Sequence, residues 1–304
     1  MEIYLPIAEM SVQWLVIVAL GFGVGFVSGL FGVGGGFLLT PLLVFYGIPS
    51  TIAVATTLSH VTASSISGAL AQWRKRAIDF KMAAVMLCGG FTGTGIGVWL
   101  FAIMRRAGQM DLVVSLSYVL LLGSVGAIML NESLATIRAA RDGRPASTRS
   151  ASRGWIQILP FKARFRQSRL YISVIPPLLI GLAVGVLSAI MGIGGGFILV
   201  PAMIYVLRMP TNMVIGTSLT QIIAVTALTT ILQATSNYAV DILLAAILIL
   251  GGVVGAQFGA RAGEKLRGEQ LRLLLALLVL AVCLRLLWGL VARPPDVYTV
   301  SLGA

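Results

Sequence analysis

The chain has 304 residues, of which 58% are hydrophobic and only 11% are charged, and its mean hydropathy is +0.98. Soluble domains carry roughly 25% charged residues, so this composition excludes a water-soluble globular protein and indicates a chain that folds in a lipid bilayer. The net charge is +12. Nine of the 22 basic residues lie in one connector, 132–170, which is typical of the cytoplasmic face of a membrane protein next to anionic lipid and excludes a nucleic-acid partner.

In chain order, apolar runs predict ten helical segments. They span 12–31, 37–47, 51–71, 81–101 and 112–131 before the connector, and 171–191, 197–207, 212–232, 241–260 and 271–291 after it. The first ten residues contain no Lys or Arg, so they lack the positive region of a cleaved signal, and we expect the first helix to be retained. Segments 37–47 and 197–207 would be about 16 Å long as helices, too short for a hydrocarbon core of roughly 30 Å. They are predicted to be half-helices or re-entrant arms; alternatively, 12–47 forms one broken spanning helix.

The two halves of the chain repeat one unit. Residues 27–37 (VSGLFGVGGGF) align with 187–197 (LSAIMGIGGGF) at an offset of 160, and 55–60 align with 216–221 at 161. Because each copy holds five segments, an odd number, the second copy enters the membrane from the opposite face. We therefore expect an all-α polytopic membrane protein with two inverted repeats, 1–131 and 171–304, that form one integrated membrane domain with the connector 132–170.

The distribution of Lys and Arg agrees with this topology, since these residues collect on the cytoplasmic side. With the connector inside, 18 of the 22 basic residues lie inside, three lie outside and Arg285 lies within the last helix. This bias predicts a multi-pass protein of the cell inner membrane with both termini in the periplasm.

Two glycine turns interrupt the apolar segments at equivalent places. Their central residues are Gly34, Gly35 and Gly36 in the first half and Gly194, Gly195 and Gly196 in the second. Unwound backbone at membrane depth is tolerated only where it is buried in protein or lines a wet cavity, and free N–H groups at the start of a half-helix favour an anion. We therefore predict a substrate site at these turns. The alternative is that the glycines only permit close helix packing.

A helix rich in hydroxyl groups follows each turn. The candidate substrate-binding residues are Thr56, Thr57, Ser59 and His60 in the first half and Thr217, Ser218, Thr220 and Gln221 in the second. Neutral hydrogen-bond donors can hold an oxyanion and release it again, as a transporter must. Alternatively, these side chains bond to their own backbone or to a neighbouring helix.

Four residues are candidates for coupling or for charge. His60, the only histidine, would relay protons or bind the ligand, or else form an interhelical hydrogen bond. Asp79 and Asp241 align at an offset of 162 and are predicted to cap helix starts. Arg285 is either functional or paired locally. With one histidine and two cysteines inside apolar runs, the chain offers no ligand set for a metal, and no cofactor is expected.

The chain resembles the TauE/SafE family of sulfite and organosulfonate exporters, also called the 4-toluene sulfonate uptake permease family. The resemblance rests on the Gly-x-Gly-Gly-Gly-Phe turn followed by Pro in both halves, on the Thr-Thr-x-Ser and Thr-Ser-x-Thr helices and on the Gly-rich fourth segment. It covers nearly the whole chain apart from the basic connector. It implies a secondary transporter of a small anion such as sulfite, sulfoacetate or another organosulfonate.

We therefore expect a transporter, and not an enzyme, that works by alternating access around a site at the midplane. The alternatives within transport are an uptake permease for thiosulfate or a non-sulfur organic anion, and a passive anion channel. A membrane-embedded enzyme or scaffold is the alternative from another class. The expected partners are a small anionic substrate and the lipid bilayer.

Overall fold

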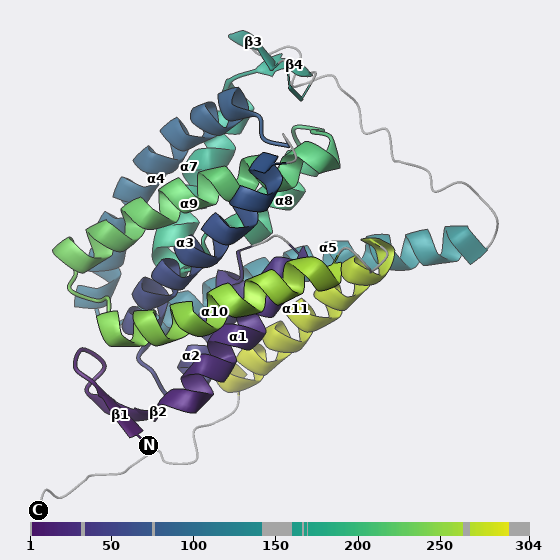
Figure 1. The fold of residues 1–304 in the computed structure, drawn as a ribbon. Coiled ribbons are helices and arrows are strands. Elements are labelled where there is room, and N and C mark those ends of the chain that lie inside the picture. Colours follow the sequence, from purple (N-terminus) through teal and green to yellow (C-terminus); the bar gives the residue numbers. More distant parts are fainter. Residues whose placement is uncertain are drawn as a thin grey trace, which may run out of the picture.

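The computed structural model describes residues 2–31, 34–74, 77–141, 160–165, 167–168, 170–263 and 268–291. Every predicted apolar segment corresponds to a helix (Figure 1). The helices of the first half are α1 (Trp14–Phe31), α2 (Gly36–Phe45), α3 (Ser50–Arg74), α4 (Phe80–Arg106) and α5 (Met110–Arg141). Those of the second half are α7 (Ile175–Met191), α8 (Gly196–Tyr205), α9 (Thr211–Ser236), α10 (Ile242–Gly263) and α11 (Gly268–Val291).

Six of the described helices, α1, α4, α5, α9, α10 and α11, are long and apolar enough to cross a membrane. Helix α3 has 25 residues, and its many serine and threonine side chains make it less apolar than these six. The shorter helices α2 and α8 have ten residues each, which gives the half-helix length expected from the sequence. The all-α polytopic fold is therefore confirmed.

Helix α2 is the returning arm of a helical hairpin and does not continue α1. The turn at Gly35 lies against Val24 and Ser28 of α1. At the other end of α2, the Gln13 N–H group donates a hydrogen bond of 3.3 Å to the hydroxyl of Tyr46, so the chain has come back to the end where α1 begins. The alternative of one broken spanning helix over 12–47 is therefore wrong.

Two short β-hairpins precede α1 and α7, and the sequence patterns did not predict them. Strands β1 (Glu2–Leu5) and β2 (Met10–Gln13) pair antiparallel, as do β3 (Lys162–Phe165) and β4 (Leu170–Ser173). The second hairpin stands 160 residues after the first, at the same offset as the glycine turns. The hairpins lie at opposite ends of the molecule (Figure 1), as two inverted copies of one unit require.

The connector predicted at 132–170 is described only in part. Helix α5 extends into it as far as Arg141, and the β3–β4 hairpin forms its C-terminal end. Residues 142–159 lie outside the described residues, together with three of the basic residues that marked the connector as cytoplasmic, Arg144, Arg149 and Arg153.

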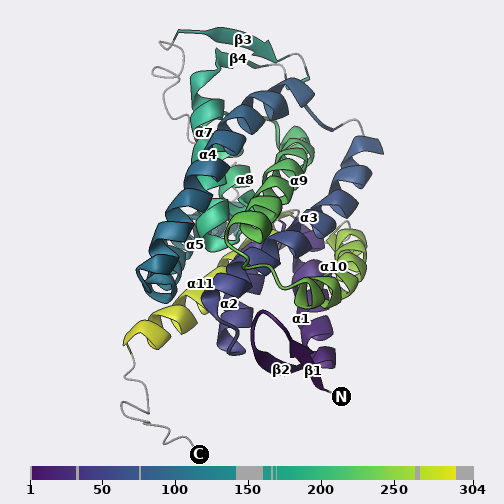
Figure 2. The ribbon, with the colours of Figure 1, turned by 90° about the vertical axis from the view of Figure 1, so that its left-hand side faces the viewer.

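Each main helix–helix contact joins one helix from each half. Helix α1 packs on α10, α4 on α7, α3 on α9 and α5 on α11 (Figures 1 and 2). The first two contacts are backbone to backbone, because glycines line them. A Cβ atom on Gly25 of α1 would lie 2.7 Å from the Cα of Gly252, and one on Gly185 of α7 would lie 2.8 Å from the backbone nitrogen of Thr94. The glycine stripes therefore have the packing role that the small-xxx-small spacing indicates.

Candidate functional site

The two glycine turns have the backbone geometry that only glycine adopts readily. Gly34 and Gly35 have φ angles of 88° and 68°, and Gly194 and Gly195 have φ angles of 73° and 81°. Gly35 and Gly195 cap the starts of α2 and α8. Within the described part of the second turn, the N–H groups of Gly195, Gly196 and Phe197 donate no hydrogen bond. These groups form the partly positive N-terminal end of α8.

The two turns contact each other. A Cβ atom on Gly36 would lie 2.6 Å from the carbonyl oxygens of both Gly192 and Ile193, so the two backbones are in direct contact. Next to this contact, the equivalent rings of Phe37 and Phe197 stack with their centroids 4.9 Å apart. The local pseudo-two-fold axis that relates the halves therefore passes between these rings.

A tyrosine of α5 ties the turns together, and sequence reasoning missed it. The buried hydroxyl of Tyr118 donates to the carbonyl oxygen of Met191 at 2.8 Å and lies 3.4 Å from that of Gly36. One side chain of the first half thus bonds to backbone at the turns of both halves.

The side chains around the turns come from the place where α3 and α9 cross. A Cβ atom on Gly34 would lie 3.4 Å from Val61, 3.5 Å from the Ser65 hydroxyl and 3.8 Å from Ile222. Val61 also contacts Gly194, so in this conformation it fills the space between the two turns.

Hydroxyl groups nevertheless lie at this crossing. The Ser65 hydroxyl is buried and has no hydrogen-bond partner. On α9, Thr226 occupies the position equivalent to Ser65, and its hydroxyl is 2.8 Å from that of Thr62. Ser65 and Thr226 belong to the same hydroxyl-rich helices but lie beyond the eight positions singled out as candidate substrate-binding residues. The signal for them was present, because Ser65 and Thr226 align at the same offset of 161 as the predicted residues.

The predicted hydroxyl residues lie elsewhere on the same helices. Ser218 and Thr220 donate to carbonyl groups one turn earlier in α9. Thr57 is buried without a partner, and Ser59 is half-buried. The hydroxyl oxygens of Thr56 and Thr217 each accept a backbone hydrogen bond from an aspartate of the other half.

Asp79 and Asp241 each form hydrogen bonds to the β-hairpin of the opposite half. The carboxylate of Asp79 accepts hydrogen bonds from the backbone of Met82 at 3.2 Å and from the backbone and hydroxyl of Ser168, in the β3–β4 turn, at 3.0 and 2.6 Å. The backbone N–H of Asp79 donates to Thr217 at 3.0 Å. Asp79 thus caps α4, as predicted, and holds the second half.

Asp241 repeats this arrangement at the other end of the molecule. Its carboxylate accepts from the backbone of Leu244 at 3.0 Å and from that of Ile7, in the β1–β2 turn, at 3.1 Å. Its own N–H group donates to Thr56 at 3.1 Å. Both carboxylates are buried. Thr56 and Thr217 therefore have structural partners on the opposite half.

His60 and Gln221 occupy equivalent places between glycine-lined helices. His60 is fully buried against Gly252 of α10, and neither of its ring nitrogens has a hydrogen-bond partner. The Gln221 amide lies beside Gly90 of α4, which aligns with Gly252, and donates a long hydrogen bond of 3.5 Å to the Met86 carbonyl.

Arg285 lies away from the glycine turns. It is exposed on the surface of α11, and its guanidinium carbon is 4.9 Å from the ring centroid of Phe45, at the end of α2. A cation–π contact of this kind satisfies the charge locally.

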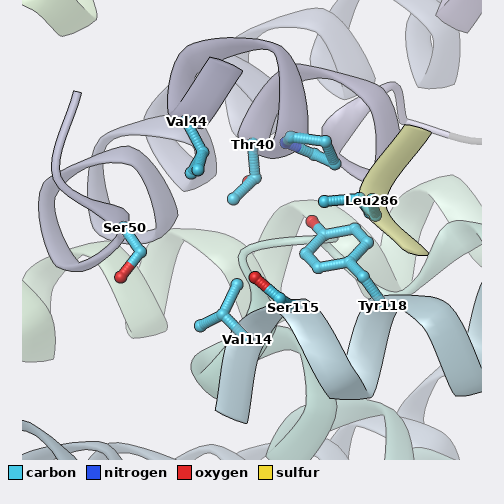
Figure 3. A pocket seen from close by; sticks show the side chains of 8 residues that line it. Thr40, Val44, Ser50, Val114, Ser115, Tyr118 and Leu286 are labelled. Carbon is cyan, nitrogen blue, oxygen red and sulfur yellow. The ribbon is translucent and has the colours of Figure 1, made fainter. Parts of the chain in front are cut away.

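A small hollow lies beside Tyr118 (Figure 3). It is partly open, has room for about one water-sized group, and is lined by Thr40, Pro41, Val44, Ser50, Val114, Ser115, Tyr118 and Leu286. The residues come from α2, α3, α5 and α11, so the hollow lies at one end of the molecule and not between the two turns.

The chain is similar to a known protein family and to known proteins over most of its length. The family model described as "Sulfite exporter TauE/SafE" matches residues 17–286. The chain is 28% identical over 274 residues to the "Probable membrane transporter protein YjnA" of Bacillus subtilis, and the alignment covers 89% of this chain and 98% of that protein. It is 30% identical over 295 residues to a "Probable membrane transporter protein" of Xylella fastidiosa, and the alignment covers 92% of this chain and 97% of that protein.

No solved structure is significantly similar to the chain. The names of the relatives indicate membrane transporters and not enzymes. Because the family model spans both halves and both glycine turns, the chain belongs to the TauE/SafE family of membrane transporters.

Proposed function

We propose that the protein is a secondary transporter that exports a small anion, such as sulfite, sulfoacetate or another organosulfonate, across the cell inner membrane. The two halves alternate access to a site at the glycine turns, with the basic connector in the cytoplasm and both termini in the periplasm. The binding groups of this site are the turn backbones at Gly34–Gly36 and Gly194–Gly196, with Ser65 and Thr226 beside them.

One observation carries this proposal: backbone turns from opposite halves touch, and the Ser65 hydroxyl beside them is buried with no partner in the protein. Native proteins rarely leave a buried hydroxyl without a hydrogen bond. Free N–H groups and hydroxyls favour an anion over a cation. Val61 closes the space between the turns in this conformation, so a movement of α3 against α9 is needed to admit the ligand, as alternating access requires.

His60 is the best candidate for coupling transport to protons. Asp79 and Asp241 are occupied as helix caps and locks between the halves, and Arg285 is stacked on Phe45. His60 is titratable and lies inside the helix bundle, and its ring nitrogens make no hydrogen bond of good geometry, although the Gly21 backbone lies close to the ring.

The test is transport by the full-length protein in liposomes, with radiolabelled sulfite, thiosulfate and sulfoacetate as substrates. Because the Ser65 hydroxyl has no protein partner, Ser65→Ala breaks no internal hydrogen bond. We expect it to raise the half-saturating anion concentration about tenfold, as expected for a lost hydrogen bond to a charged group. The matched control is Thr235→Val on α9, because the Thr235 hydroxyl is exposed and donates only to its own helix.

The proposal fails if the wild-type protein carries none of these anions, or if Ser65→Ala transports them with wild-type kinetics. Currents far above the turnover of a carrier would replace alternating access with a passive channel. Modification of a lipid by a purified protein that binds no anion would instead indicate an enzyme.

A further inference from the structure

The hollow beside Tyr118 contains hydrogen-bonding groups that the protein itself does not satisfy. The side chains of Thr40 and Ser50 are 0% and 3% exposed. The Ser50 hydroxyl has no hydrogen-bond partner, and the Thr40 hydroxyl has none of good geometry, although it lies close to the Tyr118 hydroxyl. Both side chains line the hollow. A buried hydroxyl without a partner at the edge of a hollow indicates that a polar group binds there.

The groups around the hollow are suited to negative charge. Ser50 is the first residue of α3, and the Pro49 carbonyl accepts from Ile52 and Ala53, which leaves the N–H groups of Ser50 and Thr51 outside the helical hydrogen bonds. The start of a long helix favours an anion. The eight lining residues include no carboxylate and four hydroxyls.

A positive charge lies next to the hollow. Arg285 directly precedes Leu286, which forms one wall. Its guanidinium group stacks on Phe45, the neighbour of the lining residue Val44. The charge can attract an anion without being buried with it.

The hollow also lies in the right place for a step in transport. It is at the end of α2 that returns to the β1–β2 hairpin, and its inner wall is Tyr118, whose hydroxyl bonds to the turn backbones. Thr40, another lining residue, lies against Gly192 of the second turn. Three of its four hydroxyl residues have no polar counterpart in the second half, since Val200 aligns with Thr40 and α11, the counterpart of α5, contains no serine, threonine or tyrosine.

We propose that this hollow is a second binding site for the transported anion, which waits there on one side of Tyr118 before or after it reaches the glycine turns. The proposal rests on the proposed transport of a small anion. In this conformation the hollow has room for about one water-sized group. A sulfite-sized anion enters when the Leu286 side chain changes rotamer and widens it.

The experiment measures equilibrium binding of sulfite and of methanesulfonate to the full-length protein in detergent, together with transport in liposomes. We expect the wild type to show two classes of anion site. Ser50→Ala and Thr40→Val should each weaken one class by about tenfold and leave the other unchanged. Ser65→Ala should weaken the other class. Ser124→Ala is the matched control, because this exposed hydroxyl of α5 donates only to the carbonyl of Leu121.

Each result decides between the two proposals. If Ser65→Ala weakens binding and transport while Ser50→Ala and Thr40→Val behave as wild type, the hollow holds only water and the second site is refuted, although the transport function stands. If the wild type binds and carries no anion, the transport function itself fails. Should Thr40→Val not fold, Ser115→Ala tests the same wall, and unchanged binding by that variant and by Ser50→Ala overturns the second site.

Discussion

The contact between α1 and α10 allows a sharp comparison of two glycines on one helix. A Cβ atom on Gly25 would lie 2.7 and 2.8 Å from the Cα and carbonyl carbon of Gly252, whereas a Cβ on Gly23 would meet nothing within 4 Å. Since carbon atoms pack best at about 3.5–4.0 Å, Gly25→Ala forces the two helices apart by roughly 1 Å. The obstacle is backbone, so no side-chain rotation relieves the clash.

The expected energies follow from these distances. Overpacking costs about 1–3 kcal/mol, and we expect Gly25→Ala to lie at the upper end because Gly252 is held between α1 and the ring of His60. Gly23→Ala keeps the packing and gains helix propensity, about 0.5–1 kcal/mol. The two substitutions should therefore shift stability in opposite directions.

Thermal unfolding of the purified variants in detergent provides the assay. Each kcal/mol shifts the apparent Tm by about 2–4 °C for a protein of a few hundred residues, so Gly25→Ala should melt several degrees below wild type and Gly23→Ala at or above it. Equal melting temperatures for the two variants would refute the backbone contact between α1 and α10, as would a lower value for Gly23→Ala.

Further variants test the hydrogen bonds of the two aspartates, the role of His60 and the hydroxyl of Tyr118. Asp79→Asn should lower the apparent Tm more than Asp241→Asn, because the Asp79 carboxylate accepts three hydrogen bonds and that of Asp241 accepts two. Each lost hydrogen bond costs about 1–3 kcal/mol. Equal shifts in Tm would contradict this ranking. His60→Gln should fold normally, because Gln221 fills the equivalent place, and it should abolish the part of the pH dependence of transport that comes from protonation of the imidazole. An unchanged pH profile would remove His60 from coupling. Tyr118→Phe keeps the ring and loses the bond to the Met191 carbonyl, so we expect a stability loss of about 1 kcal/mol; an unchanged melting curve would show that the hydroxyl does not hold the turns.

The helices and the turns were predictable because each depends on local sequence. A bilayer requires long apolar runs, and three consecutive glycines do not continue a helix, so segment positions and the break near Gly34 follow from the sequence alone. The hairpins were not predictable, since four-residue strands such as β1 and β3 contain no clear alternation.

The side chains at the site depend on tertiary packing, which the repeat alignment does not determine. Thr56 and Ser65 lie on one helix, and the alignment pairs both with hydroxyls on α9. Which of them faces the turns depends on the depth at which α3 crosses α9. Tyr118 was missed for a related reason: its partner, the Met191 carbonyl, is 73 residues away and carries no side-chain signal.

The single phenol of Tyr118 has a thermodynamic consequence for a protein made of two nearly equal copies. In the proposed alternating-access cycle, identical halves would give the two end states equal energies, with neither preferred at rest. Here α11 has no phenol to take the place of Tyr118 when the halves exchange roles. A hydrogen bond worth about 1 kcal/mol that forms in only one end state changes the ratio of the two populations about fivefold. If the two halves alternate as proposed, the unliganded protein is therefore expected to prefer one orientation.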